Sequence, residues 1–188
     1  MSSAAIQAGP AARIASKLSS KLGSVLSRNA GAYRPGTMSR KTRAAGGTTA
    51  AETLHEDRRF AAAVNLEGFL DWTPAAAGAP GVLLPVAEQG TKRPMLLAGS
   101  SGFGEKQALD LSWTVLLARS ARHATRLQIE DANHWVFTDF APMSAQLQAD
   151  GLMTAADRNA LVGAIPAATA VSDVRGLLRG FLGQALAR

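Results

Sequence analysis

Short apolar runs alternate with stretches of helical periodicity from residue 46 to the end of the chain. Residues 62–66 ("AAVNL") and 94–100 ("PMLLAGS") are apolar runs of strand length and predict buried strands, and we expect a third strand at residues 125–129. The segment between the first two strands, residues 71–93, is rich in Ala, Gly and Pro and predicts a loop. Helices are predicted over residues 46–58, 108–118, 143–148, 154–162 and 171–186.

This alternation of helices and strands places the chain in the α/β class, with a mainly parallel sheet flanked by helices. A length of 188 residues with 47% hydrophobic content suits one domain with a core of its own. Three strands are fewer than a parallel sheet normally contains. We therefore expect the C-terminal half of a larger sheet.

Residues 1–43 differ in composition from the rest of the chain. Eight of the 20 basic side chains and none of the 14 acidic ones fall in this segment, so the other residues, with 12 basic and 14 acidic groups, sum to −2. The segment is rich in Ser and Ala, and an apolar stripe with helical spacing runs from Ile14 to Leu26. We expect a basic, poorly structured tail, with a membrane-surface helix or a nucleic-acid arm as alternatives, followed by a domain over residues 44–188.

The composition also excludes several kinds of catalytic and metal-binding site. The chain has no cysteine, which excludes disulfides, thiolate catalysis and cysteine-bound metal. No apolar run reaches the roughly 18 residues of a membrane-spanning helix, and residues 1–26 lack the apolar core of a secretory signal. We expect no metal site at Asp131, His134 and Asp139, since neither a second histidine nor a dense acidic cluster accompanies them.

Small residues, a carboxylate and a histidine follow one another in the order used by α/β hydrolases. In those enzymes a Gly-x-Ser-x-Gly turn holds the nucleophile at a strand-to-helix junction, and the acid and the histidine come later in the chain. Here residues 45–47 ("AGG") follow the position of the nucleophile, Glu67 ends the first strand, and His134 follows the third. The order predicts a hydrolase site, but Ala44 stands where the nucleophile would be.

Three segments share their order and spacing with a known family. They are residues 46–72 ("GGTTAAETLHEDRRFAAAVNLEGFLDW"), 93–103 ("RPMLLAGSSGF") and 132–140 ("ANHWVFTDF"). Together they resemble the plasma-type platelet-activating factor acetylhydrolases and their bacterial lipase and esterase relatives. In that family a Gly-His-Ser-x-Gly-Gly elbow precedes a helix ending in a charged cluster, a strand ending at the triad acid, and a later catalytic His. The resemblance covers residues 45–188 and implies the C-terminal part of an α/β-hydrolase fold.

The resemblance assigns roles to individual residues. His134 matches the catalytic base, and Glu67 stands at the position of the triad acid, with Asp71 as the alternative. Ala44 falls at the position of the missing nucleophile, and the backbone N–H of Ala45 falls at an oxyanion donor. Three aromatic residues are candidates for lining a substrate pocket: Phe69, Trp72 and Trp135.

The activity implied by the resemblance is hydrolysis of carboxylic esters of lipids or short acyl groups, without a metal or organic cofactor. Because Ala44 replaces the serine, we expect catalysis to be impaired, and an Ala44→Ser change alone not to restore turnover. The alternative is a non-catalytic protein, either a truncated fragment or a binding pseudo-enzyme. A separate hypothesis is that the gene is truncated or frame-disrupted, because the resemblance stops abruptly before residue 45. We expect no nucleic-acid partner and, by default, a cytoplasmic location, although relatives in the family are often secreted.

Overall fold

The computed structural model describes residues 45–72 and 81–187 of the chain. The chain divides into two units, Met1–Thr42 and Arg43–Arg188, and all the described residues belong to the second. The predicted basic tail, its apolar stripe and Ala44 therefore lie outside the described residues.

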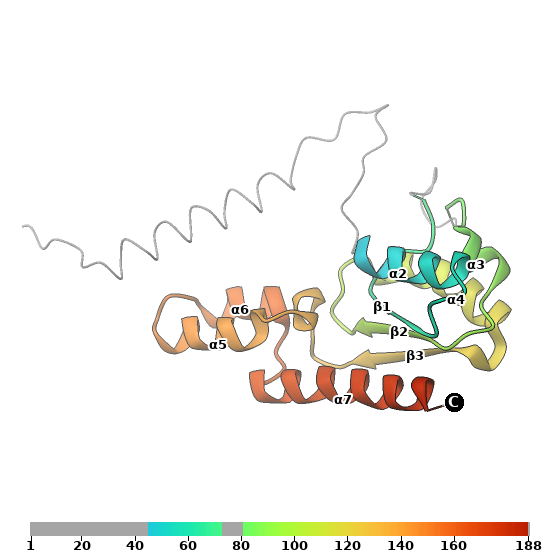
Figure 1. Ribbon diagram of the computed structural model, residues 1–188. Coiled ribbons are helices and arrows are strands. Elements are labelled where there is room, and N and C mark those ends of the chain that lie inside the picture. The colour runs from blue at the N-terminus through green and yellow to red at the C-terminus, as the bar shows by residue number, and fades with distance from the viewer. Residues whose placement is uncertain (1–44, 73–80, 188) are drawn as a thin grey trace, which may run out of the picture. The chain divides into compact units, whose positions relative to one another are not determined.

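Three parallel strands form the centre of this unit, in the order β1-β2-β3. They are β1 (Ala63–Leu66), β2 (Met95–Ser100) and β3 (Ala124–Ile129), close to the predicted positions (Figure 1). The helices are α2 (Ala45–Glu56), α3 (Pro85–Gln89), α4 (Lys106–Ser120), α5 (Phe140–Ala149), α6 (Ala155–Val162) and α7 (Ala167–Leu186), with short 3₁₀ turns η1 (Ala121–His123) and η2 (His134–Phe137).

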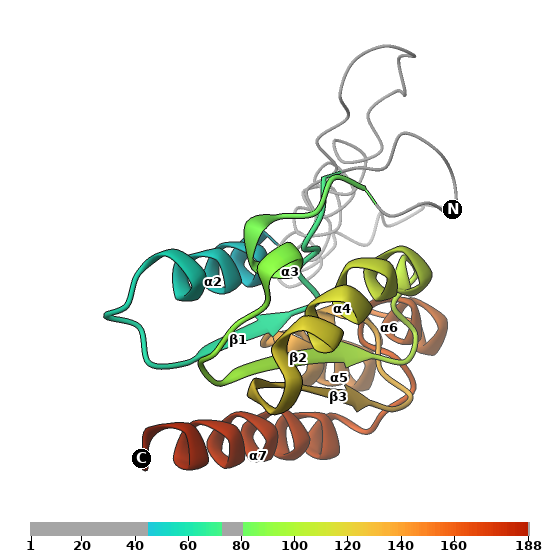
Figure 2. The same ribbon diagram turned by 90° about the vertical axis from the view of Figure 1, so that its right-hand side faces the viewer.

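Helices lie on both sides of the sheet. α2, α3 and α4 lie on one side, and α7 runs along the other (Figures 1 and 2). α5 and α6 lie beyond the carboxyl ends of β2 and β3 (Figure 1). All six residues of β2 are buried, as expected for a parallel strand in the middle of a covered sheet. The structure therefore has the layered α/β arrangement that the alternating pattern predicts.

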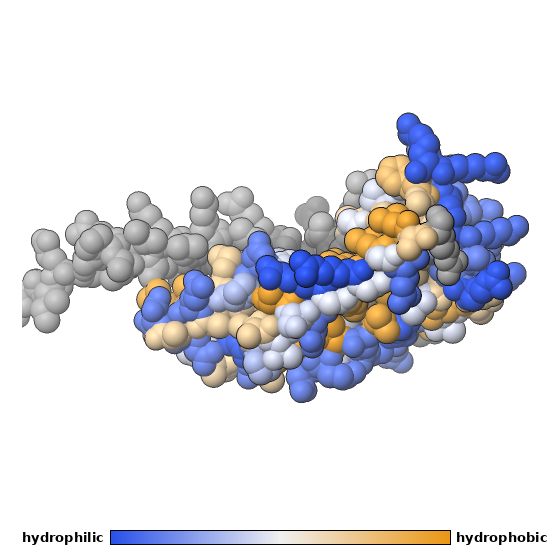
Figure 3. Space-filling model, turned by 60° about the horizontal axis from the view of Figure 1, so that its bottom comes forward, coloured by the Kyte–Doolittle hydropathy of each residue, from blue (hydrophilic) through white to orange (hydrophobic). Residues whose placement is uncertain are grey.

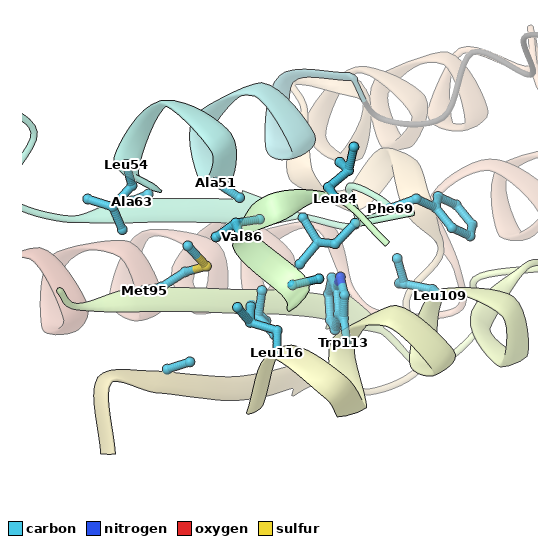
Figure 4. Close-up of a cluster of buried hydrophobic side chains, with 14 residues drawn as sticks. Ala51, Leu54, Ala63, Phe69, Leu84, Val86, Met95, Leu109, Trp113 and Leu116 are labelled. Carbon is cyan, nitrogen blue, oxygen red and sulfur yellow. The ribbon is translucent and has the colours of Figure 1, made fainter. Parts of the chain in front are cut away.

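The larger core lies between the sheet and helices α2 to α4, and we call it the sheet cluster (Figure 4). The largest side chain of this cluster is that of Trp113, which comes from α4 and is fully buried. The buried members are Ala51, Leu54, Ala63, Phe69, Leu70, Leu84, Val86, Ala87, Met95, Leu97, Leu109, Trp113, Leu116 and Ala124.

A second core, the helical cluster, lies where η2, α5, α6 and α7 meet the end of β3. Its side chains are smaller and contain no buried aromatic ring. The buried members are Ile129, Ala132, Val136, Ala141, Val162, Ile165 and Ala170. The two clusters divide the unit into a sheet-centred part and a part made of short helices.

The structure corrects one prediction and confirms another. The segment predicted as a loop between β1 and β2 contains the five-residue helix α3 and an antiparallel bridge between Asp71 and Leu83. Pro85 begins α3, where its missing N–H breaks no helical hydrogen bond. The predicted start of α6 is confirmed, because Thr154 Oγ1 accepts the Asp157 N–H at 3.1 Å.

The exposed surface is mixed in character. The side shown in Figure 3 is mainly hydrophilic, with separate hydrophobic patches. None of the helices in the described ranges has the length and apolar character needed to cross a membrane. The large apolar side chains with substantial exposure are Phe60, Trp72, Val82, Leu127, Trp135, Met143, Leu152, Leu182 and Leu186.

Candidate active site

Glu67 follows β1 at the carboxyl end of the sheet. Its backbone adopts a left-handed conformation, with φ at 56°, which is uncommon for a residue with a side chain. Asn65 stabilises this turn from the inside: its side chain accepts the Gly68 N–H at 2.6 Å and donates to the Gly68 carbonyl at 2.9 Å. Trp113 Nε1 donates to the same carbonyl at 2.9 Å. The turn is thereby attached to the sheet cluster.

The first turn of α2 packs directly against the turn of Glu67. A Cβ atom added to Gly68 would lie 2.3 Å from the Thr48 backbone nitrogen, and one added to Gly47 would lie 2.2 Å from Asn65 Oδ1. A side chain would clash at both positions, with the backbone of α2 at Gly68 and with the hydrogen-bonded Asn65 side chain at Gly47. The amino end of α2, where residue 45 begins the helix, therefore lies close to the candidate acid.

The carboxylate of Glu67 is fully buried and hydrogen-bonded on both oxygens. Oε1 accepts the Ser100 N–H at 2.5 Å and the Ser100 hydroxyl at 2.6 Å. Oε2 lies 2.6 Å from Nδ1 of His134. A buried carboxylate is tolerated in a protein when hydrogen bonds of this kind replace its hydration.

His134 begins η2, and the residue before it is attached to α6. The Asn133 N–H donates to the Val162 carbonyl at 3.0 Å, and its side-chain amide donates to the carbonyls of Asn159 and Ala160. These carbonyls belong to the last turn of α6, where carbonyl groups need partners from outside the helix; only that of Asn159 also accepts a helical bond, from the Gly163 N–H at 3.0 Å. The end of α6 thus fixes where the histidine stands.

A cleft of about 370 Å³ opens beside His134. Phe103 and Trp135 flank the imidazole, with ring centroids 5.4 and 6.0 Å from it. The histidine side chain is 37% exposed, so one side of the ring faces the cleft while Nδ1 faces the buried carboxylate. The lining residues are Gly102, Phe103, Gly104, Glu105, Asn133, His134, Trp135, Ala160 and Leu161.

The structure brings together Glu67 and His134, the two titratable residues predicted for the site. Asp71, the alternative acid, has its Oδ2 on the Gly81 N–H at 3.0 Å, while the histidine contacts Glu67. Ala45 is the first residue of α2, and Ala44 lies outside the described residues.

The three predicted pocket aromatics lie in three different environments. Trp135 lines the cleft. Phe69 is 2% exposed and belongs to the sheet cluster, where its ring centroid lies 6.1 Å from that of Phe103. Trp72 is 60% exposed and lies beside the Asp71–Leu83 bridge, outside the lining of the cleft.

Three residues of the site were missed in the sequence. The sequence predicts Ser100 only as the end of a strand and Asn65 only as part of one, and it assigns no role to Phe103. Asn65 and Ser100 could have been found from the sequence, because a polar residue inside an apolar run is expected to be buried and to need a hydrogen-bond partner. No comparable signal marked Phe103.

One solved structure has a fold similar to that of this chain. No protein-family model and no curated protein sequence matches the chain. Its structure is similar to that of a ferulic acid esterase from Streptomyces cinnamoneus, with a TM-score of 0.56 and 24% sequence identity. The match covers 96% of this chain and 50% of the esterase, so the chain spans about half the length of that protein. At this identity the likeness shows the fold alone: the chain has a partial α/β fold of the kind found in an esterase.

Proposed function

We propose that Glu67 and His134 are the acid and base of a carboxylic ester hydrolase site. The observation that supports this most directly is the 2.6 Å contact between their side chains, which are 67 positions apart in the sequence. An imidazole that donates its Nδ1 proton to a carboxylate keeps Nε2 available to accept a proton from a nucleophile. The esterase-like fold supports the same class of reaction.

In a complete site of this class, a serine oxygen attacks the ester carbonyl and its proton passes to the histidine Nε2. The same proton then goes to the departing alcohol as the ester C–O bond breaks, and water later hydrolyses the acyl-serine bond. We assign His134 to the proton transfers and Glu67 to the orientation and charge stabilisation of the ring. Ala45 N–H, among the N–H groups that the first turn of a helix leaves without helical partners, is assigned to the developing oxyanion.

The nucleophile position is where this chain departs from an active enzyme. Ala44 has no side-chain hydroxyl with which to form an acyl-enzyme. Loss of a triad serine lowers turnover by a factor on the order of 10⁶. Thr48 is a poor substitute, because its hydroxyl already donates to the Phe69 carbonyl at 2.7 Å. We propose that the chain is derived from lipases or esterases of the acetylhydrolase type and does not turn over esters by an acyl-enzyme route.

A second candidate function is ligand binding without catalysis. The cleft beside His134 keeps two aromatic walls, Phe103 and Trp135, that do not depend on the nucleophile. Aromatic walls with a small number of polar groups, here Glu105, Asn133 and His134, are typical of small-molecule sites. An ester or acyl group held there would contact the imidazole without being cleaved.

Labelling with a fluorophosphonate tests the missing nucleophile. The full chain, incubated with the probe beside an active serine esterase, is expected to show no mass increase by intact-protein mass spectrometry, while the esterase is labelled. A stoichiometric adduct on a serine or threonine of this chain would contradict the proposal and would identify the true nucleophile.

The ring tautomer of His134 tests the acid–base pair separately. In ¹⁵N NMR spectra recorded where the imidazole is neutral, we expect the proton on Nδ1 in the wild-type chain. In a Glu67→Gln variant the carboxylate acceptor is gone, and we expect this preference to weaken. A wild-type ring with its proton on Nε2 would contradict the assignment of the pair.

A further inference from the structure

The hydrogen-bond ladder between β1 and β2 changes its acceptor where it reaches Glu67. The Glu67 N–H donates to the Ala98 carbonyl at 3.1 Å, which continues the register one residue beyond Leu66. In a regular parallel ladder, the next bond would run from the Ser100 N–H to the Glu67 carbonyl. Because the Glu67 backbone turns into the left-handed region, the Ser100 N–H donates to the side-chain Oε1 instead.

The hydroxyl of Ser100 is a second donor to that same oxygen. Ser100 is 1% exposed and ends a strand whose other members are apolar residues or glycine. A buried hydroxyl needs a hydrogen-bond partner, and this one donates to Glu67 Oε1 at 2.6 Å. With Oε1 occupied by two donors from one residue, Oε2 remains for His134 Nδ1.

We propose that Ser100 is a positioning residue for the acid–base pair, fixing Glu67 Oε1 so that Oε2 meets the imidazole in one orientation. This inference rests on the proposed function, because it concerns the same two side chains. A glutamate side chain has one more rotatable bond than an aspartate side chain, and the two hydrogen bonds from Ser100 restrict that freedom.

Proton NMR of the full chain tests the role of Ser100 without any need for turnover. A short hydrogen bond from an imidazole Nδ1 to a buried carboxylate gives a resonance far downfield of the amide protons. We expect one such resonance in the wild-type chain and none in His134→Gln. In Ser100→Ala, we expect this proton to exchange with solvent about tenfold faster or more, as the loss of a hydrogen bond to a charged group implies.

Two variants control for the loss of a buried hydroxyl. Ser144 is also fully buried, and its hydroxyl donates to the Ala141 carbonyl within α5, so Ser144→Ala is expected to leave the exchange rate unchanged. Ser100→Thr keeps a hydroxyl on Cβ and is expected to keep the wild-type rate. If circular dichroism shows that Ser100→Ala is unfolded, Ser100→Cys takes its place, because a thiol fills the site but donates weakly.

The outcomes separate the two proposals. An unchanged exchange rate in Ser100→Ala, or in Ser100→Cys where that variant is used, would overturn the role of Ser100 and leave the pair intact. Absence of the downfield resonance from the folded wild-type chain would overturn the Glu67–His134 pair, and with it the proposed function. Faster exchange in Ser100→Ala together with wild-type exchange in Ser144→Ala and Ser100→Thr would support the positioning role.

Discussion

The acid and the base of the candidate pair are supported by different parts of the molecule. The turn of Glu67 is hydrogen-bonded to Asn65 and to Trp113, a fully buried member of the sheet cluster. His134 lies at the edge of the helical cluster, on a short 3₁₀ turn, with more than a third of its side chain exposed. The acid is therefore part of the core of the sheet, whereas the base is carried by a smaller and more peripheral group of helices.

The largest expected difference between the two regions is in stability. Trp113→Ala removes the largest side chain of the sheet cluster and the hydrogen bond to Gly68, and is expected to lower the free energy of unfolding by about 3–5 kcal/mol. Ile165→Val in the helical cluster is expected to cost about 0.5–1.5 kcal/mol. Urea denaturation followed by circular dichroism measures both. A loss for Trp113→Ala no larger than that for Ile165→Val would contradict the view that the sheet cluster is the main core.

A smaller effect is expected at the two asparagines that hold the acid and the base. Asn65→Ala leaves the buried Gly68 N–H without its acceptor and is expected to cost about 1–3 kcal/mol. The matched change Asn133→Ala removes hydrogen bonds to exposed carbonyls at the end of α6, and about 0.5 kcal/mol is expected. The same denaturation measurement tests both variants, and a larger loss for Asn133→Ala would contradict the placing of the acid in the core and of the base in a more peripheral region.

The smallest effect is expected at the rim of the sheet cluster, after the end of α2. The Arg59 guanidinium, hydrogen-bonded to the Asp57 carboxylate, lowers the pKa of Asp57 below its ordinary value of 3.8. A lowered folded-state pKa means that the ion pair contributes above the unfolded-state pKa and is lost as the pH falls through the folded-state value. The Arg59 side chain is 87% exposed and the pair lies at the surface, so Arg59→Gln is expected to leave stability at neutral pH nearly unchanged. In an NMR carboxyl titration, this variant should bring the midpoint of Asp57 back towards 3.8; an unmoved midpoint would contradict the attribution to Arg59.

The sequence was informative where the pattern had enough length or a fixed order. The apolar run before Ser100 predicted β2, and the order of Glu67 and His134 predicted a pair that lies within hydrogen-bonding distance in the fold. Prediction failed at α3, because five residues are too few for helical periodicity to show. Trp72 shows a second limit. The sequence places an aromatic residue near the predicted site but does not indicate where its side chain points, and the Trp72 side chain is exposed and does not line the cleft.

The attachment of Asn133 to the last turn of α6 has a consequence for local unfolding. Its backbone and side-chain amides bind three carbonyls at the end of that helix, and the Ile165 N–H returns a bond to the Asp131 carbonyl at 2.9 Å. Fraying of the helix end would therefore release the segment that carries the histidine. Hydrogen exchange in the two segments should then follow one shared opening, so that the position of the imidazole depends on the local stability of α6.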